Sequence, residues 1–327
     1  MLRFAGRTLL KAILTALLLA WLVSQIDLGR LAAAIGSTHL SFLLAAVLVQ
    51  LFSILLSVVR WRTILASFRI HISLKALAKI TFIGSFFSLV LPSGIGGDFF
   101  RAYYLAKREK RGMSTTLTTT VLERSGGLCA LLAIGVVAAA VSQIEVRGAR
   151  LVGVFLALFA FYLAAVLALF NRRVHAVVTW FLQKLRLPDI ESRMELVYQG
   201  LRKLRGNLGA VAVVLLLSLI VQFSSVVIVW IVALGLEVQA PFPVFLVFIP
   251  LINLSILVPL TINGFGLRES LYLLLFTQVG MGQERAVALS LLSTLAIAVA
   301  ALPGGLIYSL YKKEEQFDQI LHRVEEG

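Results

Sequence analysis

The chain has 327 residues, of which 60% are hydrophobic and only 14% are charged, and its mean hydropathy is +0.96. A soluble protein of this length needs more charge to cover its surface, so the composition predicts an all-α, polytopic membrane helical bundle. The formal net charge of +14 belongs to basic loops between apolar runs. Basic loops at a membrane surface suit anionic lipid headgroups, and we expect no nucleic-acid partner.

The first 24 residues place basic residues before an apolar stretch, as a signal peptide does. The AAA at residues 32–34 mimics a cleavage site. However, the apolar stretch approaches the length that spans a bilayer, which favours an uncleaved first span over a cleaved signal peptide.

Two apolar stretches, 76–106 and 243–280, are interrupted in the middle, which predicts two half-helices or a re-entrant hairpin in each. Complete spans are predicted at about 8–24, 40–59, 115–141, 150–170, 208–234 and 285–310.

The loop charges predict the topology. If both interrupted stretches enter and leave on one side, nearly all basic loop residues fall on a single side of the membrane. The opposite loops then carry only Arg30, Arg147, Arg150 and Arg285. This bias predicts that both termini are cytoplasmic.

Residues 171–206 form the one sizeable polar insertion. Apolar residues recur there at helical spacing, which predicts an amphipathic helix on the cytoplasmic leaflet. They are Ile190, Met194, Val197, Leu201 and Leu204. A surface that recruits lipid headgroups is the functional alternative. Residues 313–327 are expected to form a cytoplasmic tail.

The two interrupted stretches align when Gly94 and Gly96 are matched with Gly264 and Gly266, and the same shift carries the flanking spans onto one another. Three full spans plus a hairpin make an odd number of crossings, so the second copy must be inverted. We therefore predict one membrane domain of two inverted repeats, 1–142 and 143–312. Their hairpin tips would meet near the bilayer midplane, as in secondary transporters. Chance similarity between two glycine-rich breaks is the alternative.

The breaks read LPSGIGGDFFR at residues 91–101 and PLTINGFGLRE at residues 259–269. Each combines free backbone N–H groups, a positive helix end and an arginine, which suits an anion such as phosphate. Their candidate substrate-binding residues are Ser93, Gly94, Gly96, Gly97, Asp98, Arg101, Asn263, Gly264, Gly266, Arg268 and Glu269.

Glu123 and Arg124, in VLERSGG, add two charges within a span. Adjacent helical positions point about 100° apart, so each residue needs its own partner. We expect Arg101 or Arg268 beside Glu123, and an acid of one break, Asp98 or Glu269, beside Arg124. The three arginines would contact a phosphate while the carboxylates hold or release them. Internal pairing that only fixes the hairpins is the alternative.

Smaller features carry further expectations. Gly126 and Gly127 would let a hairpin pack closely on their span, and Trp61, beside Arg60, would be an interfacial anchor. The LPGG at residues 302–305 predicts a kink in the last span. The sequence contains no metal-ligand cluster, Walker loop or GxSxG motif, so we expect no metal, no cofactor and no enzyme activity.

The run LPSGIGGDFFRAYYL, followed by VLERSGG, GFGLRES and LPGG, resembles the lysylphosphatidylglycerol synthase transmembrane, or flippase-like, family over nearly the whole chain. The best-understood members are bacterial proteins that aminoacylate phosphatidylglycerol and move it between leaflets, with a soluble transferase domain after the membrane domain. This chain stops after a short tail. The resemblance thus implies the lipid-translocating part alone, in the bacterial inner membrane.

These observations predict a transporter or flippase for an anionic, phosphate-bearing lipid, either a phospholipid or a polyprenyl-phosphate-linked lipid. One alternative is a membrane-embedded transferase that uses the acids as general bases. The other is a non-transporting scaffold that partners lipid-synthesis enzymes.

Overall fold

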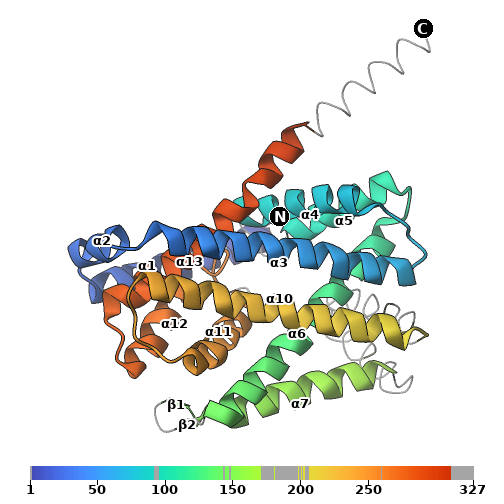
Figure 1. Ribbon diagram of the computed structural model, residues 1–327. Coiled ribbons are helices and arrows are strands. Elements are labelled where there is room, and N and C mark those ends of the chain that lie inside the picture. The colour runs from blue at the N-terminus through green and yellow to red at the C-terminus, as the bar shows by residue number, and fades with distance from the viewer. Residues whose placement is uncertain are drawn as a thin grey trace.

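The computed structural model describes residues 2–91, 96–142, 144–146, 149–170, 180, 198, 200, 202, 206–258 and 260–310. This part of the chain is almost entirely helical (Figure 1). The helices of the first half are α1 (Leu2–Gln25), α2 (Leu28–Gly36), α3 (Leu40–Ser67), α4 (Leu74–Val90), α5 (Gly96–Arg108) and α6 (Met113–Ser142). Those of the second half are α7 (Leu151–Phe170), α10 (Leu208–Gly235), α11 (Phe242–Leu257), α12 (Leu267–Phe276), the 3₁₀ helix η1 (Thr277–Val279) and α13 (Gln283–Ala301). Two-residue strands, β1 (Glu145–Val146) and β2 (Ala149–Arg150), pair antiparallel between α6 and α7.

Five of the described helices are long and apolar enough to cross a membrane. They are α3, α6, α7, α10 and α13, the last counted as far as Leu310. A sixth span results if Leu9–Gln25 and Leu28–Gly36 are taken as one bent pair. The chain is therefore a polytopic helical membrane bundle, as the composition predicts. The last span is interrupted by a turn at Leu302, where the LPGG predicts a kink.

The bend between α1 and α2 was not predicted. The two helices meet at 86°, and Asp27 begins α2 as its N-cap. The Asp27 carboxylate accepts hydrogen bonds from the backbone N–H groups of Gly29 and Arg30, at 2.8 and 3.0 Å. This cap satisfies backbone N–H groups at the start of α2 that have no acceptor within the helix. It therefore stabilises a helix that starts in a new direction after α1.

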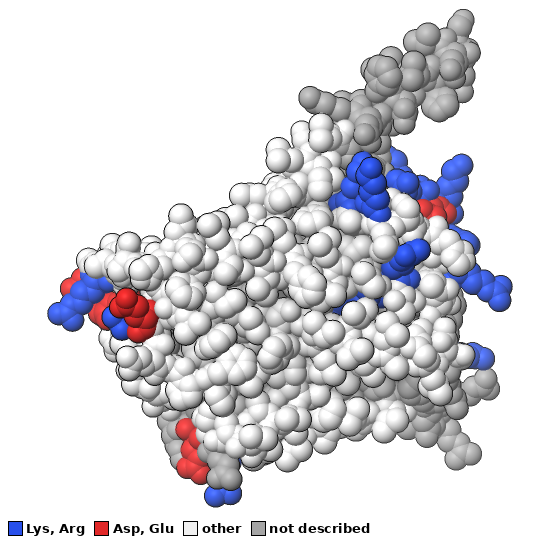
Figure 2. All heavy atoms as spheres, viewed as in Figure 1, with Lys and Arg blue, Asp and Glu red and all other residues white. Residues whose placement is uncertain are grey.

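Charged residues gather at the two ends of the bundle, separated by a wide uncharged band (Figure 2). One end, where α3 and α5 finish and α4 begins, is strongly basic. It includes Arg62, Arg69, Lys75, Lys107, Arg108, Lys110 and Arg111. The opposite end mixes both signs, with Asp27, Arg30, Glu145, Arg150, Glu237, Glu284 and Arg285. The band between them has the apolar surface that a bilayer requires.

Both interrupted stretches are helical hairpins. Helices α4 and α5 approach each other closely at Gly84 and Gly97. A methyl group added to Gly97 would overlap the Gly84 carbonyl oxygen, and one added to Gly84 would overlap the Arg101 side chain. In the second pair, Phe276 at the end of α12 lies 5.3 Å from Phe245 near the start of α11, measured between ring centroids. Each pair thus runs antiparallel, and each returning helix begins where the sequence predicts, just before Asp98 and Arg268.

The two hairpin turns contact each other. The Asn263 side-chain amide donates a hydrogen bond to the Leu91 carbonyl oxygen at 2.8 Å. The predicted site residues Ser93 and Gly94 lie outside the described residues, as does Pro259. Re-entry of both hairpins into a bilayer stays a prediction.

The order of helices repeats along the chain. Helices α3 and α10, which begin at Leu40 and Leu208, both have 28 residues. Helices α4 and α11 begin at Leu74 and Phe242. One and the same shift in residue number therefore carries α3 onto α10 and the start of α4 onto the start of α11.

The equivalent helices α3 and α10 lie side by side and antiparallel (Figure 1). The His39 N–H donates to the Gly235 carbonyl at one end, and Arg60 donates to Ser218 toward the other. Equivalent helices must run in opposite directions in an inverted repeat, so this pair has the required geometry. The division into repeats 1–142 and 143–312 stays a prediction.

Most of the polar insertion, and the tail from residue 311 onward, lie outside the described residues. The amphipathic helix predicted for residues 171–206 is among these segments. Gly200, which is described, is buried against Leu122 and Thr118 of α6. The insertion therefore contacts the membrane helices at this point.

Candidate functional site

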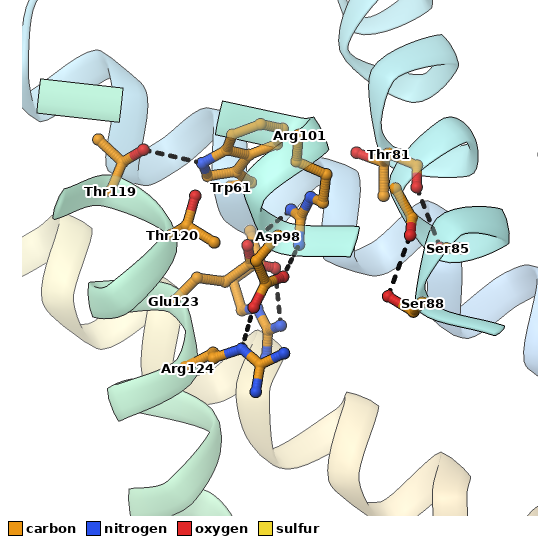
Figure 3. A network of polar contacts seen from close by, with 12 residues as sticks. Trp61, Thr81, Ser85, Ser88, Asp98, Arg101, Thr119, Thr120, Glu123 and Arg124 are labelled. Carbon is orange, nitrogen blue, oxygen red and sulfur yellow. Dashed lines mark hydrogen bonds and ion pairs between the residues drawn. The ribbon is translucent and has the colours of Figure 1, made fainter. Parts of the chain in front are cut away.

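Five charged side chains from three helices form a continuous network (Figure 3). We call it the charged cluster, and it consists of Arg60 of α3, Asp98 and Arg101 of α5, and Glu123 and Arg124 of α6. Glu123 lies between two arginines, with Arg60 Nη2 at 2.8 Å from Oε1 and Arg101 Nη2 at 2.7 Å from Oε2. Asp98 pairs with Arg124 through Nε and with Arg101 at 3.7 Å.

Arg101 is held on several sides. Its guanidinium carbon lies 4.2 Å from the centroid of the Trp61 ring, a cation–π contact. Its side-chain carbons pass over Gly84, where any larger residue would displace them. The Trp61 indole N–H donates to Thr119 of α6 at 3.1 Å, which fixes the ring. The arginine is therefore positioned by α3, α4 and α6 together.

The charged cluster contains three arginines and two carboxylates, so it carries one formal positive charge when all five groups are ionised. The buried Nε groups of Arg60 and Arg101 have no hydrogen-bond partner. The side chain of Arg124 is 47% exposed, whereas that of Glu123 is 3% exposed. The cluster therefore combines a buried core with one accessible arginine, and its net charge favours an anion.

The second hairpin turn has a smaller and more local polar group. The Glu269 carboxylate accepts from the Gly266 N–H at 2.7 Å, from Ser290 at 3.3 Å and from Arg268 at 3.3 Å. Arg268 also lies 5.6 Å from the Phe265 ring centroid. The carboxylate thus caps α12 and holds the neighbouring arginine, one of the roles that the sequence predicts for it.

This turn has the backbone that its glycines predict. Asn263, Gly264 and Gly266 all have positive φ, of 51°, 77° and 79°. Gly266 also approaches Leu18 and the Thr15 carbonyl of α1 closely. The Thr15 hydroxyl accepts the Ile262 N–H at 3.1 Å. Helix α1 is therefore part of the structure that supports the turn.

The expected pairings of Glu123 with Arg101 and of Arg124 with Asp98 both occur. Arg268 is different, because no ion pair among the described residues joins it to the charged cluster. The three arginines that the sequence singles out are thus divided between two groups, each at a hairpin.

Two expectations about α3 were wrong. Trp61 is completely buried, so it is not an interfacial anchor. Arg60 follows the predicted end of the span 40–59, so it belongs to the basic loop residues that the topology prediction places on the cytoplasmic side, but it is buried in the charged cluster. The reason is that α3 continues to Ser67, beyond the predicted end of the span at residue 59. The apolar pair Ile64 and Leu65, both fully buried, is the sequence signal that this helix continues.

The expected packing of a hairpin on Gly126 and Gly127 was also wrong. Gly126 lies against Ser218 of α10, and Gly127 lies against Gln222, whose amide donates to the Gly127 carbonyl at 3.1 Å. Gly126 and Gly127 therefore admit α10, a long helix of the second half, at their own positions.

The fold and the charges define a polytopic membrane protein with an ionised cluster between its apolar helices. The family model described as the lysylphosphatidylglycerol synthase TM region matches residues 8–305. The chain belongs to this family, which agrees with the resemblance found in its sequence and makes it a lipid-related membrane protein. No curated protein and no solved structure matches the chain.

Proposed function

We propose that this protein moves an anionic, phosphate-bearing lipid between the leaflets of the membrane, as a flippase or lipid transporter. The observation that carries the proposal is the charged cluster, a net positive network at a hairpin inside an otherwise apolar bundle. Ionised residues at bilayer depth are costly and usually serve function. Arginine is the side chain best suited to hold a phosphate through paired hydrogen bonds.

The depth of the cluster supports a site near the midplane. Glu123 is ten residues beyond the start of α6 at Met113, which corresponds to roughly 15 Å along the helix axis. The hydrocarbon core of a bilayer is about 30 Å thick. If the hydrocarbon core begins near Met113, a headgroup bound at Arg124 would be close to midway between the two leaflets, while its acyl chains remain among the lipids.

The exposures suggest separate roles for the arginines. Arg124, with its accessible side chain, would contact the phosphate first, and Asp98 would release it. Arg101 and Arg60, at 12% and 9% side-chain exposure, share the buried Glu123 and would set the positive field. Arg268, at 18%, would approach from the second hairpin. Carboxylates that compete with the phosphate for arginines keep its binding reversible.

The hairpins support alternating access to such a site. They open toward opposite charged ends and touch through Asn263 and Leu91. Two re-entrant hairpins in an inverted repeat would leave the headgroup site reachable from either side in turn. The basic end would face the cytoplasm and would contain both termini, following the positive-inside rule.

The test begins with the lipids that co-purify with the protein. Mass spectrometry of wild type should show enrichment of one phosphate-bearing anionic lipid over the surrounding membrane extract, and Arg124→Gln and Arg268→Ala should reduce it. Arg150→Gln, which removes an exposed arginine at the mixed-charge end, is the matched control. The enriched lipid is then followed in proteoliposomes by the accessibility of its headgroup.

Transport predicts that wild type makes the headgroup of this lipid accessible on both sides and that Arg124→Gln slows the exchange. An identical lipid profile in wild type and both arginine variants would contradict the proposal. So would formation of a new covalent product without exchange, which is the outcome that a transferase predicts.

A further inference from the structure

A hollow of about 620 Å³ lies at the basic end of the molecule, outside the charged cluster. It is formed by one face of α3 and by the segment that joins α3 to α4. Its lining is Val59, Arg62, Thr63, Ala66, Ile70, His71, Ile72 and Ser73. The α3 residues of this set follow helical spacing, so they share one side of the helix. Arg62 and His71 are exposed, and Ile70 and Ile72 are buried.

An exposed apolar stripe leads along α3 into this hollow. It consists of Leu44, Leu48, Phe52, Leu55 and Val59. Their spacing of three or four residues places them on the face that continues to Arg62 and Thr63. The stripe runs for about 22 Å along the helix axis, which is comparable to an extended acyl chain. An apolar stripe that ends beside a cation is complementary to a lipid, which has an apolar chain and an anionic headgroup.

The polar part of the hollow suits a phosphate. Arg62 supplies a permanent positive charge, and His71 supplies a ring nitrogen that donates a hydrogen bond or carries charge. Ser73 is the N-cap of α4, so the positive end of that helix dipole adjoins the hollow. The surrounding end of the molecule is basic as well (Figure 2). This charge is complementary to an anionic headgroup and offers nothing specific to a zwitterionic one.

We propose that this hollow is a second lipid site, which binds one anionic phospholipid of the leaflet at the basic end, with its phosphate at Arg62 and His71. Arg60 and Arg62 are two positions apart on α3 and therefore point to nearly opposite sides of the helix. Arg60 is buried in the charged cluster and Arg62 is exposed. The site is thus separated from the proposed transport site by the helix itself, and its lipid would be a bound, non-transported one.

Native mass spectrometry of the full chain in detergent tests this site, with phosphatidylglycerol and phosphatidylcholine as probes. Wild type should bind phosphatidylglycerol in preference to phosphatidylcholine. Arg62→Gln should reduce the apparent affinity for phosphatidylglycerol about fivefold, since one basic residue at a lipid surface contributes about 1 kcal/mol. Arg62→Lys should retain most of the binding. Arg108→Gln, which removes an exposed arginine of the same end that does not line the hollow, is the matched control.

Two further arms separate a lipid from other occupants. Val59→Asn should weaken phosphatidylglycerol binding while leaving Arg62 in place, and glycerol phosphate, which has no acyl chain, should not compete. Equal losses in Arg62→Gln and Arg108→Gln would overturn the proposal, because they would show attraction without a site. Effective competition by glycerol phosphate would overturn it in favour of a soluble phosphate. A monodisperse elution profile of each variant excludes misfolding as the cause.

Discussion

The two hairpins occupy equivalent places in the chain, but their charged residues have different kinds of partner. In the first hairpin, Asp98 and Arg101 of α5 pair with Arg124 and Glu123 of α6, and Arg101 also lies over the Trp61 ring of α3. In the second, Glu269 caps its own helix and holds the adjacent Arg268, and among the described residues Ser290 of α13 is its one hydrogen-bond partner from another helix. The first hairpin is therefore joined to the bundle by ion pairs, whereas the second, whose Phe248 and Phe276 are buried in the apolar core, is joined mainly by apolar packing.

The helices around the hairpins show the same asymmetry. When α3 is aligned with α10 from their first residues, Arg60 and Trp61 correspond to Ile228 and Val229, which are buried in the apolar core. When the two breaks are aligned through their glycines, Glu123 of α6 corresponds to Ser293 of α13. The order of helices is thus similar in the two halves, but the charges of α3 and α6 have no counterparts at these positions of α10 and α13. This difference makes the first hairpin the better candidate for binding an anion.

The largest difference between the hairpins should appear in their acids. Glu123→Gln leaves Arg60 buried without a counter-charge and leaves Arg101 with only the longer pair to Asp98, which should reduce the free energy of unfolding by about 3–5 kcal/mol. Glu269→Gln keeps one acceptor oxygen and loses only part of the bonding to the Gly266 N–H, Ser290 and the partly exposed Arg268, for a loss of about 1.5–3 kcal/mol. Denaturant unfolding in detergent micelles measures both. A larger loss for Glu269→Gln would reverse the comparison.

The next largest effect concerns the close approach of α4 and α5. A methyl group in Gly97→Ala would overlap the Ser88 hydroxyl and the Gly84 carbonyl oxygen, so the two helices must separate at a cost of about 1–3 kcal/mol. Gly112→Ala, in open space before α6, should change the stability by less than about 0.5 kcal/mol. Thermal unfolding of the two variants decides whether this packing holds the hairpin together. Equal melting temperatures would argue against it.

The smallest effect concerns the contact between the turns. Asn263→Gly keeps the positive φ accessible and removes only the hydrogen bond to the Leu91 carbonyl, for a loss of about 1 kcal/mol. Asn263→Asp should be worse, because it places a carboxylate against a carbonyl oxygen. Unfolding of the two variants under identical conditions gives their order. If Asn263→Asp proved the more stable, the turn-to-turn bond would not exist as described.

The sequence predicts the part of the site that follows from the cost of burying charge. Glu123 and Arg124 lie inside an apolar span, so both had to pair. The sequence left Arg101 or Arg268 and Asp98 or Glu269 as partners, and the structure pairs them with Arg101 and Asp98. The position of the breaks follows from glycines that adopt positive φ, as Gly264 and Gly266 do.

The rest depends on tertiary packing. Arg60 reads as a loop residue because basic residues at the end of an apolar run usually mark the membrane surface. Only contact with Glu123 and Ser218 reveals it as buried. Likewise, Arg268 pairs with its neighbour because the tight turn at Gly266 brings the Glu269 carboxylate back over the start of α12. The burial of Arg60 is not visible in a linear pattern, and the sequence predicts that Glu269 holds an arginine but not that this arginine is its neighbour.

The proposed transport depends most on the meeting of the two hairpin turns where the lipid headgroup would pass. In a Cys129→Ser background, which removes the single native thiol, Leu91→Cys and Ile262→Cys place one thiol in each turn. A short, reducible thiol cross-linker should join them in the membrane and stop exchange of the co-purified lipid, and reduction should restore the exchange. Failure to cross-link, or undiminished lipid exchange in the cross-linked protein, would contradict the account.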